Sequence, residues 1–421
     1  MSELSNLLLD FLAYQQEQSD VYKKKYTLLS TLLERNCLDL FEKEWKIAEV
    51  ELQKSTEIDA LYYHHDFTLH SAYYDYLVLY NNRHPVAHQL RSILLQKIDV
   101  YYLVEKLRRV ANLLSSSAIL KDYTTEQNAD FLEQAKQLLQ MATADHFFRV
   151  PLINLYYYAT RLFVFRDNAD YELLMQQVAI FEKDISITEL SVLYKFAFNY
   201  CAQQIIINKI NMWQQIDTLY SKILALGILL VNGQISPVEF KNIVTTKYRL
   251  GKYAEAQIFI ETYKDKLPKS DQLIATYLNG QTAFYLKQYQ EALTCLAEVE
   301  MTDSIDRIQV NMLQIKCYFE QLYDPMASTM NNRVRARQEE TAANKLSAFD
   351  EYLKAHKGIN NQKRLTYRNF VRLTRRLFTL YEKKETGAQK DKKDIPQQTT
   401  LLKSDIQKLS PIDADWLLSK L

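Results

Sequence analysis

Five histidines lie within 25 residues of one another in the N-terminal half, and their type and spacing would suit a metal: His64, His65, His70, His84 and His88. His84 and His88 are four residues apart, so a helix would place both imidazoles on one face. However, Pro85 predicts a helix start beside His84, where the imidazole caps the helix or faces solvent. Because the sequence holds no H-E-x-x-H or other complete ligand set, we expect packing or surface histidines, with no metal site and no cofactor.

A basic segment near the C-terminus is the second candidate. Residues 357–393 hold 12 Lys and Arg against three acidic residues, a net charge of +9, so the other 384 residues carry −8. Its candidate anion- or partner-binding residues are Arg364, Arg368, Arg372, Arg375 and Arg376. Four of these arginines recur every four residues, which predicts one charged stripe along a helix with an apolar opposite face.

Three interpretations of this basic helix are open. It caps a helical array, with its arginines contacting the acidic remainder of the chain, since charge runs on helices are usually solvated faces. It binds an anionic partner such as an acidic peptide or RNA, an interpretation that the nearby Arg333, Arg335 and Arg337 slightly favour. The third interpretation is that it lies on an anionic membrane surface.

No enzyme motif occurs in the sequence. The glycine-rich nucleotide loops, the G-x-S-x-G nucleophile turn and the protein-kinase motifs are all absent. The cysteines are scattered without a C-x-x-C pair, so we expect buried thiols of a reducing compartment: Cys37, Cys201, Cys295 and Cys317. The sequence therefore predicts a protein that is not an enzyme.

The elements that must position these residues are predicted to be helices. Of 421 residues only 6 are Gly and 7 are Pro, too few for the turns of a β-sandwich, a barrel or a glycine-rich α/β enzyme. Pro85, Pro151 and Pro237 each stand where a helix would begin, the last after a predicted N-cap, Ser236. The N-terminus lacks signal-peptide features, and the longest uncharged apolar stretch, 223–231, is too short to span a bilayer, so we expect a cytoplasmic protein.

Tyrosine is abundant, with 30 residues. Tyr73, Tyr76 and Tyr80 recur at helical spacing, and a stripe of this kind usually packs in a seam between helices. The alternative is that part of the stripe grips a peptide, because tyrosine combines a large apolar ring with a hydroxyl that suits an interface.

An internal repeat is the clearest signal of architecture. Tyr253, Tyr289 and Tyr323 follow similar short segments and are 36 and 34 residues apart. This period is typical of helix–turn–helix repeats. Gly251 is free to adopt the positive φ of a tight turn, and Gly280 lets two helices approach closely.

Residues 237–268 resemble a tetratricopeptide repeat, with a turn glycine, a turn aromatic, a small residue and a terminal proline at the family's positions. Residues 273–304 resemble a second repeat, and residues near 307–338 a degenerate third, in which Met326 replaces the small residue. The family's early tryptophan is absent, and Phe240 and Thr276 take its place. The repeat-defining residues are Phe240, Gly251, Tyr253, Ala256, Pro268, Gly280, Tyr289, Ala292 and Tyr323. The resemblance implies an all-α, right-handed superhelix of antiparallel helix hairpins.

The composition changes after Lys384. The polar stretch that follows, with Gly387 and Pro396, predicts a flexible linker, and the helical pattern that returns after it predicts an amphipathic tail that docks on its own chain or on a partner. The expected regions are a divergent N-terminal helical region of further repeats or a bundle (1–145), the repeats (146–356, clearest in 237–338), the basic capping helix (357–384), the linker (385–400) and the tail (401–421).

The function expected from this architecture is binding. Stacked hairpins form a concave surface, and proteins of this class resemble scaffolds that hold a peptide, a helix or the tail of a partner protein. The alternative is an RNA- or polyanion-binding protein that acts through the basic 357–393 segment, whose affinity would fall strongly with added salt.

Overall fold

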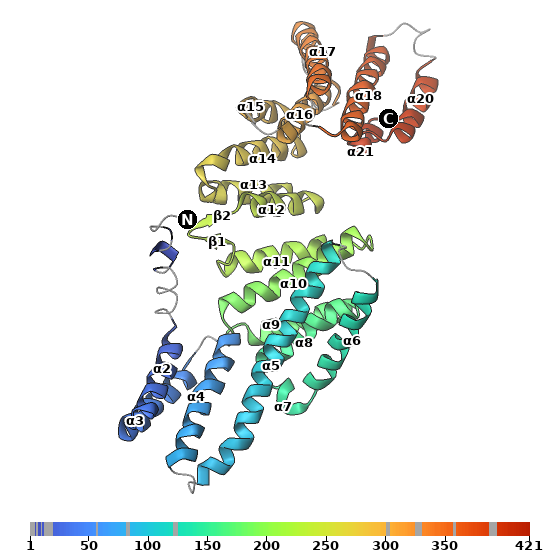
Figure 1. The fold of residues 1–421 in the computed structure, drawn as a ribbon. Coiled ribbons are helices and arrows are strands. Elements are labelled where there is room, and N and C mark those ends of the chain that lie inside the picture. The colour runs from blue at the N-terminus through green and yellow to red at the C-terminus, as the bar shows by residue number, and fades with distance from the viewer. Residues whose placement is uncertain are drawn as a thin grey trace. The chain divides into compact units, whose positions relative to one another are not determined.

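The computed structural model describes residues 5, 7–9, 11, 20–55, 58–80, 85–120, 125–299, 304–324, 331–356, 359–386 and 394–421 (Figure 1). Almost all of these residues are helical, and the strands among them are limited to one short antiparallel pair, β1 (Leu230–Val231) and β2 (Gln234–Ile235). The expected all-α class is therefore confirmed. The chain divides into two compact units, Met1–Ile228 and Leu229–Leu421.

The N-terminal unit is built around one long helix, α5. Its described helices are α2 (Val21–Glu34), α3 (Leu38–Gln53), α4 (Ala60–Tyr80), α5 (Pro85–Leu120), α6 (Thr125–Ala142), α7 (Asp145–Phe148), α8 (Pro151–Val164), α9 (Asn168–Phe181), α10 (Ile187–Ile206) and α11 (Trp213–Ala225). Helices α4, α6, α8 and α10 all pack on α5. Because α8 packs on α5 and α6, the helices on both sides of residue 145 belong to one unit, although the sequence predicts a boundary there.

The C-terminal unit consists of helices that pack on their neighbours in sequence. They are α12 (Pro237–Arg249), α13 (Tyr253–Tyr263), α14 (Gln272–Tyr285), α15 (Tyr289–Ala297), α16 (Ser304–Tyr323), α17 (Asn332–Ala355), α18 (Asn361–Thr386), α20 (Ile395–Leu409) and α21 (Ala414–Ser419). Each helix from α12 to α17 packs on the next one, and α14 also contacts α12 and α16. One hydrophobic core joins α16, α17, α18, α20 and α21, with Phe319, Phe349 and Phe370 at its centre.

Prolines and cap residues determine where several helices begin. Pro85, Pro151 and Pro237 are the first residues of α5, α8 and α12, as predicted. Proline suits this position because its φ is already helical and it has no N–H to leave unpaired. The N-cap prediction is also confirmed, since Ser236 Oγ accepts a hydrogen bond of 3.1 Å from Glu239 N.

The two repeat-like hairpins turn in the same way. Gly251, between α12 and α13, has a φ of 70°, the left-handed conformation that the sequence predicts. Lys287 takes the same conformation, with a φ of 62°, at the corresponding place between α14 and α15. A Cβ on Gly280 would lie 3.0 Å from Leu296 Cγ, so α14 and α15 approach closely at this point.

The remaining repeat-defining residues lie at helix ends and in the core. Tyr253 and Tyr289 begin α13 and α15, and Tyr323 ends α16, while Pro268 lies between two short 3-10 turns, Lys264–Lys266 and Lys269–Asp271. Five of the nine are buried: Phe240, Ala256, Gly280, Tyr289 and Ala292. Met326 lies outside the described residues.

The region after Lys384 differs from the prediction. Glu385 and Thr386 complete α18, and residues 395–400 form the start of α20, whereas the sequence predicts a flexible linker over 385–400. Residues 387–393, with Gly387, lie outside the described residues. Residues 395–400 are helical and not a linker because Pro396 stands in the first turn of α20, where proline is compatible with a helix. The tail docks on its own chain, because Leu402, Ile406 and Leu417 are buried in the core.

Candidate binding groove

A groove with a cavity volume of about 610 Å³ lies in the C-terminal unit. Residues of α12, α14 and α16 form its walls, and α18 and the turn between α20 and α21 contribute at its edge. The lining residues are Lys241, Thr245, Tyr248, Arg249, Tyr277, Leu278, Gln281, Tyr285, Gln309, Met312, Leu313, Lys316, Tyr367, Ile412 and Asp413.

Equivalent positions of the two repeat-like units face this groove. Lys241, Thr245 and Arg249 are spaced by four residues on α12 and so share one helical face. The residues 36 positions further on are Tyr277, Gln281 and Tyr285 on α14, and all three also line the groove. Successive first helices of each hairpin therefore turn the same face toward one concavity.

Hydrogen bonds and ring stacking hold two of the tyrosine side chains that line the groove in place. The Tyr248 hydroxyl donates to Leu278 O at 2.9 Å and is 2.7 Å from Thr282 Oγ1. Burial, the largest cause, raises the pKa of Tyr248 well above its usual value of 10, so the ring remains a neutral hydrogen-bonding group. The Tyr285 ring stacks on Tyr253, with 4.8 Å between centroids and 6° between planes.

The charge of the groove is mainly positive. Among the described residues that line it, Lys241, Arg249 and Lys316 are cationic and Asp413 is the one anionic residue. Asp413 forms an ion pair with Lys316, whose side chain is 13% exposed. Burial, the largest cause, raises the pKa of Tyr285, and the nearby Tyr253 hydroxyl and Asp413 carboxylate raise it further.

Most of these lining residues are not among the site residues that the sequence predicts. The predicted tyrosines and glycines define the repeat and determine its turns and packing, whereas the lining residues lie on the faces of α12, α14 and α16 that turn toward the groove. The signal was present in the sequence, because Lys241, Thr245 and Arg249 recur as Tyr277, Gln281 and Tyr285 at the repeat distance. The residue types at these equivalent positions differ between the two units. Their equivalence is therefore visible in the structure, where both sets line one groove, and not in the residue types of the sequence.

The five candidate arginines of α18 do not meet in one open site. Arg368 Nε donates to Asp350 Oδ1 at 3.0 Å, and Arg376 Nη1 donates to Asp405 Oδ2 at 2.5 Å. Arg364 donates to two main-chain carbonyls just before α18, those of His356 and Ile359. Arg372 lies near enough to Asp405 to help lower the pKa of that carboxyl, after the larger effect of Arg376.

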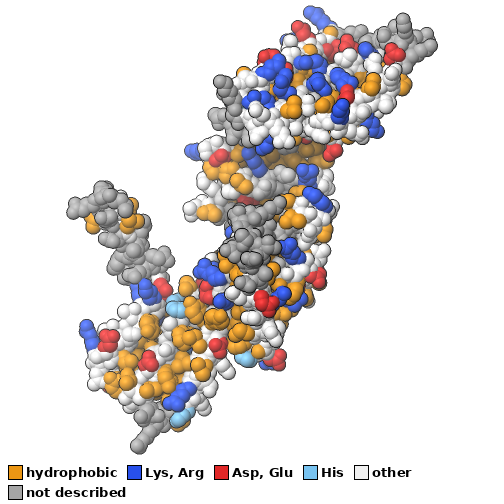
Figure 2. All heavy atoms as spheres, turned by 45° about the vertical axis from the view of Figure 1, so that its right-hand side comes forward, with side chains coloured by type: hydrophobic (Ala, Val, Ile, Leu, Met, Phe, Trp, Pro, Cys, Tyr) orange, Lys and Arg blue, Asp and Glu red, His pale blue; other side chains and the backbone are white. Residues whose placement is uncertain are grey.

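Arg375, the fifth of them, lines a separate cavity of about 350 Å³ together with Glu339, Glu340 and Glu382. Its surroundings are therefore acidic. Figure 2 shows one face of the C-terminal unit at the top of the view, where Lys and Arg side chains predominate and fewer Asp and Glu side chains lie among them.

His64, His65 and His70 lie on α4, with 5.7 Å between the ring centroids of His64 and His65. His65 Nε2 is 3.5 Å from Asp20 Oδ1, and His70 Nδ1 is 3.2 Å from Asp66 Oδ1. Lys97 Nζ pairs with the other oxygen of that carboxylate, Asp66 Oδ2, at 2.5 Å. His84 lies outside the described residues. Within the described ranges, no group of three or more His, Cys, Asp and Glu residues could hold a metal ion.

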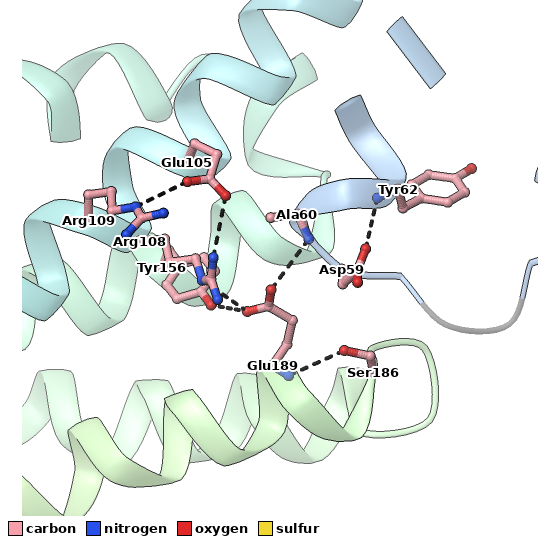
Figure 3. Close-up of polar contacts among 9 residues, drawn as sticks. All are labelled: Asp59, Ala60, Tyr62, Glu105, Arg108, Arg109, Tyr156, Ser186 and Glu189. Carbon is pink, nitrogen blue, oxygen red and sulfur yellow. Dashed lines mark hydrogen bonds and ion pairs between the residues drawn. The ribbon is translucent and has the colours of Figure 1, made fainter. Parts of the chain in front are cut away.

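The N-terminal unit contains a buried polar cluster around Glu189 (Figure 3). Glu189, 2% exposed, accepts hydrogen bonds from Ala60 N at 3.3 Å and from the Tyr156 hydroxyl, and Arg108 Nε lies 3.7 Å from its Oε2. Burial and the charge of Glu189 raise the pKa of Tyr156. Because both carboxylate oxygens are used and enclosed, we interpret the cluster as a structural joint between α4, α5, α8 and α10.

Comparisons with protein-family models, with curated proteins and with solved structures find nothing that matches this chain. Among the described helices, none combines the length and the apolar character that a membrane span requires.

Proposed function

We propose that this chain is a non-catalytic interaction protein whose C-terminal unit binds a peptide segment of a partner protein in the groove between α12, α14 and α16. In this proposal the helix hairpins form a tetratricopeptide-like array with a right-handed superhelical course. The groove is the concave surface of that array, and the N-terminal unit is a divergent continuation of the same kind of architecture.

One observation carries the proposal: equivalent positions of two hairpins, 36 residues apart, line one concavity. A ligand that contacts Lys241, Thr245 and Arg249 on α12 can continue onto the matching positions of α14 and then onto α16, as an extended chain would. The lining supports a peptide ligand in its chemistry too. Tyrosine rings offer apolar area with hydroxyls, and Gln281 and Gln309 can pair with a peptide backbone.

The test is a selection from a displayed library of random linear peptides on the full chain. Selected peptides are synthesised, and their Kd is measured by fluorescence anisotropy. Two variants fill the groove from exposed positions, Thr245→Trp and Gln309→Trp. Two matched controls make the same substitutions at exposed positions of outer helices, Thr294→Trp on α15 and Gln257→Trp on α13.

We expect the groove variants to weaken binding by at least about tenfold, or ~1.4 kcal/mol, and the controls to leave it unchanged. Circular dichroism checks that all four variants are folded. Peptides that bind the groove variants as tightly as the wild type, or a selection that yields no binder, would overturn the proposal.

We propose no second function for the arginine stripe of α18. The polyanion alternative needs several unpaired cations on one face, yet Arg364, Arg368 and Arg376 all have partners within the chain. We therefore expect the chain to elute from heparin at low salt, and an Arg372→Gln/Arg375→Gln variant to elute in the same fractions. Strong retention that this variant loses would revive RNA or another polyanion as the ligand.

A further inference from the structure

The turn between α20 and α21 lies at the edge of the groove and has an unusual backbone. Ile412 and Asp413 both line the groove. Ser410 and Asp413 have φ values of 40° and 55°, although neither is a glycine. Residues with a Cβ adopt this left-handed conformation only at an energetic cost, which the surrounding structure must offset.

The helices on both sides of this turn are firmly held. Leu402 and Ile406 of α20 and Leu417 of α21 are buried in the core of the unit. Trp416 Nε1 donates to Glu320 Oε1 at 2.8 Å, and the Tyr381 hydroxyl donates to Lys420 O at 2.8 Å. Contacts outside the groove therefore fix the helices on both sides of the strained turn.

Inside the groove, the turn carries a carboxylate that pairs with a lysine of α16. Asp413 pairs with Lys316, and Ile412 N donates a longer hydrogen bond to Thr366 O, at 3.4 Å. Pro411 of the same turn is buried. Lys316 Nζ also lies 5.5 Å from the centroid of the Trp416 ring, so its position is fixed by the tail. The chain therefore presents an apolar residue followed by a carboxylate to its own groove.

We propose that the groove binds an acidic segment of a partner protein, whose carboxylate takes the place of Asp413 on Lys316. This inference rests on the proposed function and names its ligand class. In this proposal the 410–413 turn competes with the ligand for Lys316, and its Asp413 carboxylate is the same chemical group that the ligand would supply. The described lining residues include three cations, Lys241, Arg249 and Lys316, against one carboxylate, so the net charge of the groove favours a segment with carboxylates over a neutral one.

The experiment uses the full chain and the peptides selected as above. Each peptide is synthesised twice, as selected and with Asn and Gln in place of Asp and Glu. Affinities are compared for wild type, Asp413→Asn, Lys316→Gln and the double variant. Lys269→Gln and Asp265→Asn serve as matched controls, because both residues are exposed and lie outside the groove. Thermal melts verify that the variants remain folded.

If the inference holds, selected peptides are rich in Asp and Glu, and Asp413→Asn binds them about two- to fivefold more tightly than the wild type does. Lys316→Gln weakens them by a similar factor, and in the Lys316→Gln background Asp413→Asn has no further effect, because competitor and ligand then share no cation. The neutral peptide versions bind weakly and equally to all these variants.

Two results would overturn the inference. Peptides that are blocked by Thr245→Trp but show no acidic preference and no response to Asp413→Asn would leave the peptide-binding function standing and remove the acidic ligand. A response to Asp413→Asn that persists in the Lys316→Gln background would mean that the turn affects the groove by its shape and not by its charge.

Discussion

At the scale of single residues, Glu189 illustrates the limit of what local sequence can predict. Ser186 is the N-cap of α10, and Glu189 N donates to Ser186 Oγ at 3.2 Å. In the usual pattern the glutamate turns back to its own N-cap. Here its carboxylate instead accepts from Ala60 N, 129 residues away. Periodicity carries no information about partners at such separations, so the cluster of Figure 3 could not be predicted.

Replacing Glu189 should destabilise the N-terminal unit strongly. Glu189→Ala leaves the Tyr156 hydroxyl and the Arg108 guanidinium without their buried partner, and we expect a loss of about 3 kcal/mol in the free energy of unfolding. Denaturant unfolding followed by circular dichroism measures it. Glu172→Ala, at an exposed position of α9, is the matched control and should change stability by less than about 0.5 kcal/mol. Equal effects of the two substitutions would contradict the structural role.

The pH dependence of stability should depend on His65. Burial lowers the pKa of His65 from 6.5, an effect that Asp20 opposes and His64 reinforces. The unfolded chain therefore binds a proton at a pH where the folded chain does not, so the free energy of unfolding falls as the pH drops below 6.5 toward the folded pKa. We expect His65→Gln to lose less stability than the wild type between about pH 7.5 and pH 5.5. His146→Gln, at an exposed position, should keep the wild-type slope; identical slopes for both variants would exclude this role.

At the scale of elements, the sequence predicts helix starts better than it predicts what a polar segment does. Pro85, Pro151 and Pro237 identify three helix starts because proline suits the first turn. The same reasoning applied to Pro396 would have predicted α20, but the polar residues before it pointed to a linker. What α20 packs on depends on Phe370 and other residues of α16 to α18, and composition cannot reveal that.

Two adjacent leucines of α20 test this packing. Leu402 is 2% exposed and Leu401 is 53% exposed. Leu402→Ala leaves a cavity in the core and should cost about 2–5 kcal/mol of unfolding free energy, whereas Leu401→Ala should cost less than about 1 kcal/mol. Thermal and denaturant unfolding of the two variants provide the comparison. Similar stabilities would mean that the tail is only loosely attached, as a linker over 385–400 would imply.

At the scale of the whole molecule, the chain divides into two compact units, Met1–Ile228 and Leu229–Leu421, where the sequence predicts five regions. The near-neutral charge of +1 conceals the basic 357–393 segment, and the structure balances part of that segment locally through Asp350 and Asp405. Charge counts along the chain identify the segment correctly. They cannot tell a binding surface from a set of internal ion pairs, because that depends on which helices lie beside α18.

The two units should respond to mutation separately. Glu189 and Leu402 belong to different units, so we expect Glu189→Ala to increase amide hydrogen exchange within residues 1–228 and Leu402→Ala within residues 229–421. The double variant should show the sum of both effects to within about 0.5 kcal/mol. Hydrogen exchange of the full chain, read by mass spectrometry, makes this comparison. Faster exchange in both units from either single substitution would show that the chain unfolds as one body.

The polar cluster at Glu189 also has a consequence for folding during translation. Ser186 N donates to Ile58 O at 3.1 Å, and Glu189 caps Ala60, so the start of α4 is completed by residues that leave the ribosome 129 positions later. At roughly 5–20 residues per second, that delay is about 6 to 26 s. During this interval the start of α4 lacks its hydrogen bonds with Ser186 and Glu189, although its packing partners α2, α3 and α5 are made earlier. A chaperone that acts during translation has this interval in which to protect the start of α4.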